Sequence, residues 1–218
     1  MIVPTMSDEE IYEEIKTDFS NLDDKIRYSE NKFQSALKKA THFPFVQSYP
    51  YETRERHNRY VITYTAQGFF DYNRPLVSVH CLFRDKSGEA AAAVNWMTGN
   101  IMMYQNHFFR RYRERVIKDT SVSIQDTIER FFSKEWSFFG VKITQELEDI
   151  FHCFEGHYAD DRVDVLVCAE EGYAFGCQKE GLFVIKTIIT DEMLSERQRA
   201  LFPQLSDSHR ALNNQIYY

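Results

Sequence analysis

Apolar residues near the start of the chain recur at three- and four-residue spacing, which is the period of an amphipathic helix. They are Ile11, Ile15, Phe19 and Leu22, followed by Phe33, Ala36 and Leu37. Ser7 and Glu10 have the spacing of a capping box and predict the start of the helical segment. We expect helical structure over residues 7–39, with a break at residues 21–24.

A loop is expected next, at Phe43-Pro44 and residues 48–51, because proline biases the residue before it away from helix. From residue 59 the pattern changes to alternating positions rich in β-branched and aromatic residues, which is typical of strands. Turn-forming runs at residues 85–88 and 98–100 separate these strands. The predicted antiparallel meander has strands over residues 59–66, 76–83, 89–96 and 101–104.

Helical periodicity returns after this meander. One helix is predicted from Asn106 to about Ile117, a second begins at Ser123, and a third runs from Thr144 to about Phe154. The final group of elements comprises three strands and a short helix capped by Thr190. These cover residues 163–169, 173–178, 182–190 and 191–201.

Together these elements predict an α+β fold: an N-terminal helical segment, an antiparallel sheet meander, central helices and a C-terminal three-stranded meander. The helical segment would form an acidic leader, residues 1–40, ahead of an α+β body, residues 41–218. The leader could also pack on the body within one domain. The chain has 218 residues, of which 43% are apolar, so either arrangement buries a proper core.

Composition predicts a soluble cytoplasmic protein. No stretch approaches the ~20 apolar residues that cross a bilayer, and the N-terminus lacks the basic and apolar regions of a secretory signal. The cysteines show no metal-site spacing, and free buried thiols are favoured, with Cys168 facing Cys177 across a hairpin as the alternative. The four are Cys81, Cys153, Cys168 and Cys177.

Charge and motifs narrow the function classes. The formal net charge is −7, and residues 1–24 carry this whole excess, with eight acidic residues against one lysine. The chain has no phosphate-cradling loop of the common nucleotide hydrolases, no dinucleotide-binding GxGxxG motif, and neither HExxH nor GxSxG. No cofactor is therefore expected.

The strongest local feature is a basic helix, residues 106–118, with five basic residues and one acidic residue from His107 to Lys118. At about 100° per residue, His107, Arg111 and Arg115 form one row along this helix, beside an apolar face. An imidazole beside two guanidinium groups can hold a phosphate and move a proton. The alternative is a solvated helix edge with weak exposed ion pairs.

A lysine interrupts the apolar strand at residues 181–190. Strict alternation puts Phe183, Ile185 and Ile189 on one face. The other face would carry Lys186 and Thr190 among Leu182, Val184 and Ile188. A lysine among apolar residues is costly unless it reaches solvent, a partner or a ligand. Lys186 is thus a candidate site residue, with a lysine that extends to solvent at the sheet rim as the alternative.

The run His152-Cys-Phe-Glu-Gly-His157 contains three kinds of transition-metal ligand within six residues. No second ligand pair stands at a zinc-finger spacing, and two ligands five residues apart are poorly placed on a helix. We therefore expect no metal site.

The stretch from His107 to Thr190 resembles RelE-like domains of the barnase, colicin and RelE superfamily of metal-independent ribonucleases. The resemblance rests on HxxxRxxxR opening a helix, on Ser123-Ile-Gln-Asp126 opening the next, and on two strand segments. These segments are Gly172-Tyr-Ala-Phe-Gly and Val184-Ile-Lys-Thr-Ile-Ile-Thr190. An insertion of about residues 135–162 and the whole of residues 1–100 lie outside the family pattern.

This resemblance implies cleavage of an RNA phosphodiester by its own 2′-hydroxyl. His107 would be the general acid or base, and Arg111 and Arg115 would bind the phosphate. Lys186 would add electrostatic support, with Thr187 or Thr190 orienting the substrate. The acidic leader would then act as an internal polyanion over the basic helix.

The competing hypothesis, which we favour, is a binding or assembly module without enzymatic activity. Its helical leader would dock a partner, and the row of His107 and the arginines would be the edge of an interface. The partner would be an unknown protein or RNA, and not a membrane. The sequence leaves the oligomeric state open.

Overall fold

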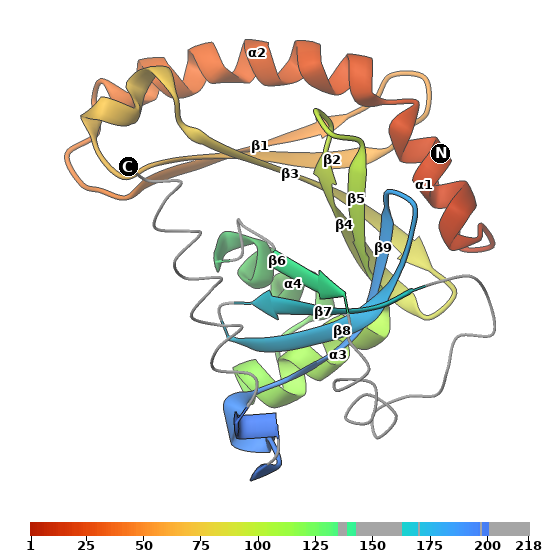
Figure 1. Cartoon of the computed structure of the whole chain (residues 1–218). Helices are drawn as coiled ribbons and strands as arrows, with labels where there is room; N and C mark the ends of the chain where they lie inside the picture. The colour runs from red at the N-terminus through yellow and green to blue at the C-terminus, as the bar shows by residue number, and fades with distance from the viewer. Residues whose placement is uncertain (135–138, 143–162, 170, 197, 201–218) are drawn as a thin grey trace. The chain divides into compact units, whose positions relative to one another are not determined.

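The computed structural model describes residues 1–134, 139–142, 163–169, 171–196 and 198–200. The chain forms two compact units, Met1–Met103 and Tyr104–Tyr218. The expected α+β class is confirmed, because helices precede an antiparallel meander and further helices precede a second one (Figure 1). In the described part of the chain, no helix is long and apolar enough to cross a membrane.

Two helices open the N-terminal unit, α1 (Asp8–Lys16) and α2 (Phe19–Leu37). The capping box of Ser7 and Glu10 is confirmed, with both of its hydrogen bonds formed. The predicted break at residues 21–24 is wrong, because α2 runs through it. The chain breaks instead at Thr17 and Asp18, where the Asp18 carboxylate is buried and bound by residues beyond the helix.

The first meander contains β1 (Phe45–Glu52), β2 (Arg59–Ala66), β3 (Leu76–Asp85), β4 (Gly88–Asn95) and β5 (Asn100–Tyr104), neighbours in that order. Strands β2 to β5 match the predicted segments closely. The predicted loop at residues 48–51 is wrong, since it lies within β1, where Pro50 stands opposite Val61. Proline is tolerated on an edge strand because its missing N–H can face away from the ladder.

The core of this unit lies between α2 and one face of the meander (Figure 1). Tyr60, Ile62, Tyr64 and Ala66 of β2 are buried there, together with Leu22, Ile26, Phe33 and Leu37 of α2. The rings of Phe33 and Tyr64 stack with their centroids 5.2 Å apart. The Tyr64 hydroxyl also donates to the carbonyl of Ile26 at 2.6 Å, which ties the helix to the strand.

The C-terminal unit begins with α3 (Asn106–Tyr112), which continues as a π-turn, η2 (Arg113–Ile117), before α4 (Ile124–Lys134). The predicted helix from Asn106 to about Ile117 is therefore confirmed in extent, but its second half is wound differently. An aromatic cluster buries the apolar faces of both helices, and many of its ring contacts are edge-to-face. Its members are Tyr104, Phe108, Phe109, Tyr112, Phe131 and Phe132.

The second meander contains β6 (Phe139–Lys142), β7 (Val163–Ala169), β8 (Gly172–Lys179) and β9 (Leu182–Ile189). The last three strands match the predicted segments, and β6 adds a fourth beside β7. The short helix predicted at residues 191–201 is only partly formed. A 3₁₀ turn, η3 (Asp191–Met193), is followed by the extended residue Leu194, and Ser195 rather than Thr190 caps the turn that begins after it.

Lys186 is the extra residue of a β-bulge in β9. Opposite Phe175 and Gly176 of β8, the register steps from Thr187 to Ile185. Residues opposite each other on antiparallel strands share a face, so the strict alternation predicted for this strand is wrong beyond Lys186. Thr187 and Ile189 lie on the face of Leu182 and Val184, while Ile188 joins Phe183 and Ile185.

Candidate functional site

The predicted row of His107, Arg111 and Arg115 is divided between two kinds of helix. His107 and Arg111 lie on successive turns of α3, and both are half-buried. Arg115 lies in the π-turn, which holds more residues per turn than an α-helix. The even spacing of the predicted row therefore does not continue past α3.

Two of the six candidate site residues predicted from the sequence, Arg115 and Thr187, are in contact with each other. The Arg115 Nη1 atom lies 3.3 Å from the Thr187 hydroxyl and 2.5 Å from the carbonyl oxygen of Ile188. Thr187 is only 5% exposed. These contacts attach the π-turn to β9.

The basic helix is less cationic than its sequence indicates. Arg111 pairs with Glu114 at 2.9 Å, and Lys118 pairs with Glu192 at the same distance. Arg113 donates to the carbonyl of Val122 at 3.0 Å. Arg110 is exposed and forms no ion pair with a described carboxylate. The surface of α3 and η2 thus combines paired and open guanidinium groups.

His107, Lys186 and Thr190 remain candidate residues, and their placement is compatible with a shared site. The backbone N–H of Gln105 donates to the carbonyl of Ile185 at 3.3 Å, which puts the start of α3 beside the β-bulge. His107 is two residues after Gln105 in the chain, and Lys186 is the residue after Ile185. Both are half-buried, as is Thr190, which follows β9.

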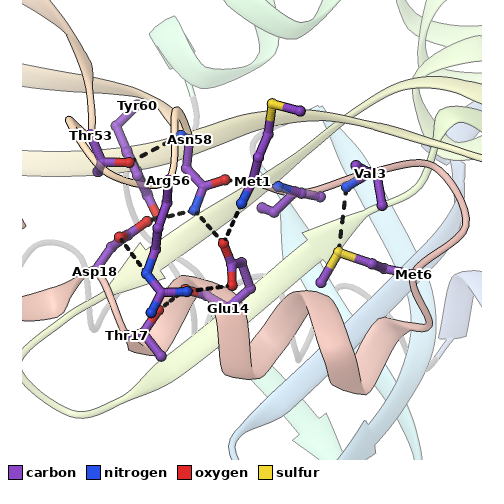
Figure 2. Close-up of polar contacts among 11 residues, drawn as sticks. Met1, Val3, Met6, Glu14, Thr17, Asp18, Thr53, Arg56, Asn58 and Tyr60 are labelled. Atoms are coloured by element: carbon purple, nitrogen blue, oxygen red, sulfur yellow. Dashed lines mark hydrogen bonds and ion pairs between the residues drawn. The ribbon is translucent and has the colours of Figure 1, made fainter.

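A second polar cluster joins the acidic leader to the first meander (Figure 2). The Asp18 carboxylate, fully buried, accepts hydrogen bonds from Asn58 at 2.7 Å and from Tyr60 at 2.8 Å. Arg56 pairs with Glu14 at 2.7 Å and lies 3.8 Å from Asp18. Two leader carboxylates therefore have partners within their own unit, which weakens the expectation that the leader acts as a polyanion for the basic helix.

Burial and neighbouring groups shift the pKa values of several residues around this cluster. Partial burial by itself would raise the pKa of Glu14, but hydrogen bonds from the Met1 ammonium and Asn58 lower it below its usual value. Burial, with the neighbouring Cys81 and Asp18, raises the pKa of Tyr60. Burial also raises the pKa of the Cys81 thiol. The cluster holds its tyrosine and cysteine protonated at neutral pH, as a structural network would.

An exposed aromatic surface in the N-terminal unit is not among the predicted sites. The 3₁₀ helix η1 (Phe69–Asn73) between β2 and β3 presents Phe69 and Phe70, which are 57% and 81% exposed. Phe43, from the segment between α2 and β1, packs edge-on against Phe69 with ring centroids 4.9 Å apart. The adjacent residues Phe69 and Phe70 are visible in the sequence. Because phenylalanine is usually buried, the pair gives no reason to expect an exposed surface.

Exposed cationic side chains stand in the segments of the chain that carry these rings. Lys38, at the end of α2, lies 5.2 Å from the ring of Tyr72 in η1, and Gln34 of α2 donates to the Tyr72 carbonyl. The exposed Lys39 and Arg74 belong to the same two segments. We call this surface the aromatic end and define it as Lys38, Lys39, Phe43, Phe69, Phe70 and Arg74.

Among the described residues, no group of three or more His, Cys, Asp or Glu side chains is arranged to hold a metal ion. The run from His152 to His157 lies outside the described residues, as does the helix predicted from Thr144. Cys81, Cys168 and Cys177 are buried and belong to no disulfide, which confirms the prediction of buried thiols for these three residues. Cys168 stands opposite Tyr173 rather than Cys177, so the predicted facing pair is wrong.

The geometry thus offers two candidate sites: the neighbourhood of His107 in the C-terminal unit, and the aromatic end in the N-terminal unit. Comparison with protein-family models, curated proteins and solved structures found no match to this chain.

Proposed function

We propose that this protein is a binding module whose docking surface is the aromatic end. The observation that carries the proposal is the exposure of two adjacent phenylalanines, with 81% of Phe70 open to solvent. Full burial of such a side chain is worth about 1.5–3 kcal/mol. The fold gives up this stabilisation at Phe70, and a partner that covers the ring would recover it.

The surroundings of the two rings support a docking role. Phe69 and Phe70 lie on η1, which packs against the end of α2 through Gln34 and Tyr72. Exposed apolar residues scattered singly are ordinary, whereas aromatic residues gathered with cations are typical of binding surfaces. Phe43 joins the rings from a third segment, so the aromatic end is built by tertiary contacts.

A comparison of the wild type with the Phe69→Ala/Phe70→Ala variant tests the proposal. Affinity capture after cross-linking should recover a partner with the wild type and lose it with this variant. Met97→Ala is the matched control, because Met97 is 83% exposed in the same unit but lies outside the aromatic end. Equal capture by all three proteins would refute a docking role for the aromatic end.

A second candidate function is metal-independent RNA cleavage in the C-terminal unit. The hydrogen bond from Gln105 to Ile185 favours it, because it places the helix of His107 beside the bulge of Lys186. In this proposal His107 is the general acid or base and Arg111 binds the phosphate. Arg115 and Thr187 would position the π-turn against β9 instead of contacting RNA.

An RNA cleavage assay in EDTA tests this candidate. The wild type should cleave, and His107→Ala should abolish cleavage while unfolding at the same temperature as the wild type. Arg110→Ala is the control on the same helix, since its side chain is exposed. Cleavage that survives in His107→Ala would exclude the proposed chemistry.

A further inference from the structure

We infer that the aromatic end binds single-stranded nucleic acid, with bases stacked on Phe69 and Phe70 and phosphates held by Lys38, Lys39 and Arg74. This inference rests on the proposed docking function and adds the chemical class of the partner. Stacking rings beside a strip of cations are the two components with which proteins bind single strands without sequence preference.

The charge of the surface favours a polyanion. Residues 31–51, which lead from α2 through β1, contain no Asp or Glu but three lysines, in a chain with a formal net charge of −7. Within the described part of the chain, no carboxylate forms an ion pair with Lys38, Lys39 or Arg74. The nearby Asp71 carboxylate accepts a hydrogen bond from the Gln67 N–H at 2.6 Å. The aromatic end is therefore locally positive, which attracts phosphates despite the overall charge.

The ring of Phe70 is positioned for stacking by a glycine. A Cβ atom added at Gly68 would lie 2.6 Å from Cε1 of Phe70, so the ring occupies the space that a side chain at residue 68 would take. Gly68 has an extended backbone, which any residue can adopt. A methyl group at this position would move the ring without straining the chain.

The exposed groups match what a single strand of nucleic acid requires. A stacked base needs one ring face, and a phosphate needs one cation. Two exposed rings and three cations provide these elements at a surface built from short segments.

The test is fluorescence anisotropy with a labelled oligouridylate at low salt and the full-length protein. The wild type should bind, and Phe69→Ala/Phe70→Ala should weaken binding by about tenfold or more, the loss expected for one stacked base. Gly68→Ala, which displaces only the Phe70 ring, should also weaken binding. Met97→Ala should bind like the wild type.

The phosphate contacts are tested separately by salt dependence. Lys38→Ala/Lys39→Ala should weaken binding and reduce the slope of log affinity against log salt by about 0.7 for each lost contact. Lys86→Ala is the control, because Lys86 is an exposed lysine in the turn between β3 and β4. An unchanged slope in the double variant would refute the assigned phosphate contacts.

Two results would refute binding of single-stranded nucleic acid and leave the proposed docking function intact. One is failure of oligouridylate to bind a wild-type protein that still captures a partner through Phe69 and Phe70. The other is binding of polyglutamate as tightly as oligouridylate, which would assign the surface to an acidic polypeptide. If the wild type, Phe69→Ala/Phe70→Ala and Gly68→Ala bound oligouridylate equally well, the aromatic end would be refuted as the binding site.

Discussion

The guanidinium of Arg115 donates from Nη1 to the main-chain carbonyl of Ile188 at 2.5 Å, across 73 residues of sequence. The same atom lies 3.3 Å from the Thr187 hydroxyl. The π-turn is thereby anchored to the strand on which the β-bulge of Lys186 occurs. The contact assigns Arg115 a structural role that its position in an HxxxRxxxR pattern does not reveal.

Replacing Arg115 should therefore affect stability. Arg115→Ala should lower the free energy of unfolding by about 1–3 kcal/mol, because it leaves a part-buried carbonyl without its charged donor. Urea unfolding followed by circular dichroism measures the change. Arg110→Ala, on the exposed side of the same helix, should stay within about 0.5 kcal/mol of wild type. Equal stabilities for the two variants would contradict the anchoring role.

Asp18 should be among the most sensitive positions in the N-terminal unit. Asp18→Ala leaves Asn58 and Tyr60 without their buried acceptor. Breaking a buried charged network of this kind costs about 3–5 kcal/mol. Thermal unfolding should show a large loss for Asp18→Ala and little change for Asp24→Ala, which removes an exposed carboxylate from α2. Similar melting temperatures for both would show that the network contributes little.

Stability should fall with acidification through His80. Burial lowers the pKa of His80 from 6.5 to about 4, so the folded state keeps the neutral imidazole. Between these values the unfolded chain binds more protons, and stability is lost as pH falls from 6.5 to 4. The loss amounts to about 3 kcal/mol, at about 1.4 kcal/mol per pKa unit.

The measurement is the free energy of unfolding at several pH values for wild type and His80→Gln. Their difference should be constant above pH 6.5 and should shift in favour of the variant as the pH falls, because glutamine does not titrate. A difference that is independent of pH over this window would show that His80 does not couple folding to protonation.

Gly176 should tolerate no side chain. A Cβ atom there would lie 2.0 Å from the main-chain carbonyl oxygen of Val184, at the step in register beside the bulge. Since backbone must move, Gly176→Ala should cost about 1–3 kcal/mol or more. Gly68→Ala is the control, because its Cβ meets only the exposed ring of Phe70. Chemical denaturation that ranks the two variants equally would contradict this reading of the β8–β9 contact.

Local pattern was sufficient for most of the secondary structure. The capping box at Ser7, the strand at residues 59–66 and the helix starting at Asn106 depend on neighbours in sequence, and the structure confirms each. The buried aromatic face of α3 follows from helical periodicity for the same reason. The α+β class could be predicted because it depends only on the order of these elements.

The predictions that failed depended on distant partners. Pro50 lies in a strand because β1 is paired along one side only, and α2 begins at Phe19 because residues of β2 and the turn before it bind Asp18. The bulge at Lys186 reversed the expected faces of β9 beyond it, since register is set by pairing with β8. None of these contacts has a local sequence signature.

The features of the candidate sites can also be divided into those set by the local sequence and those set by distant contacts. The sequence by itself determined which residues carry titratable and cationic chemistry on α3, from His107 to Lys118. Only the tertiary structure decided that Arg115 is bound to β9 and that Phe69 and Phe70 remain exposed on η1. The physical reason is that side-chain chemistry is a property of single residues, whereas burial, pairing and exposure depend on segments that folding brings together from distant parts of the chain.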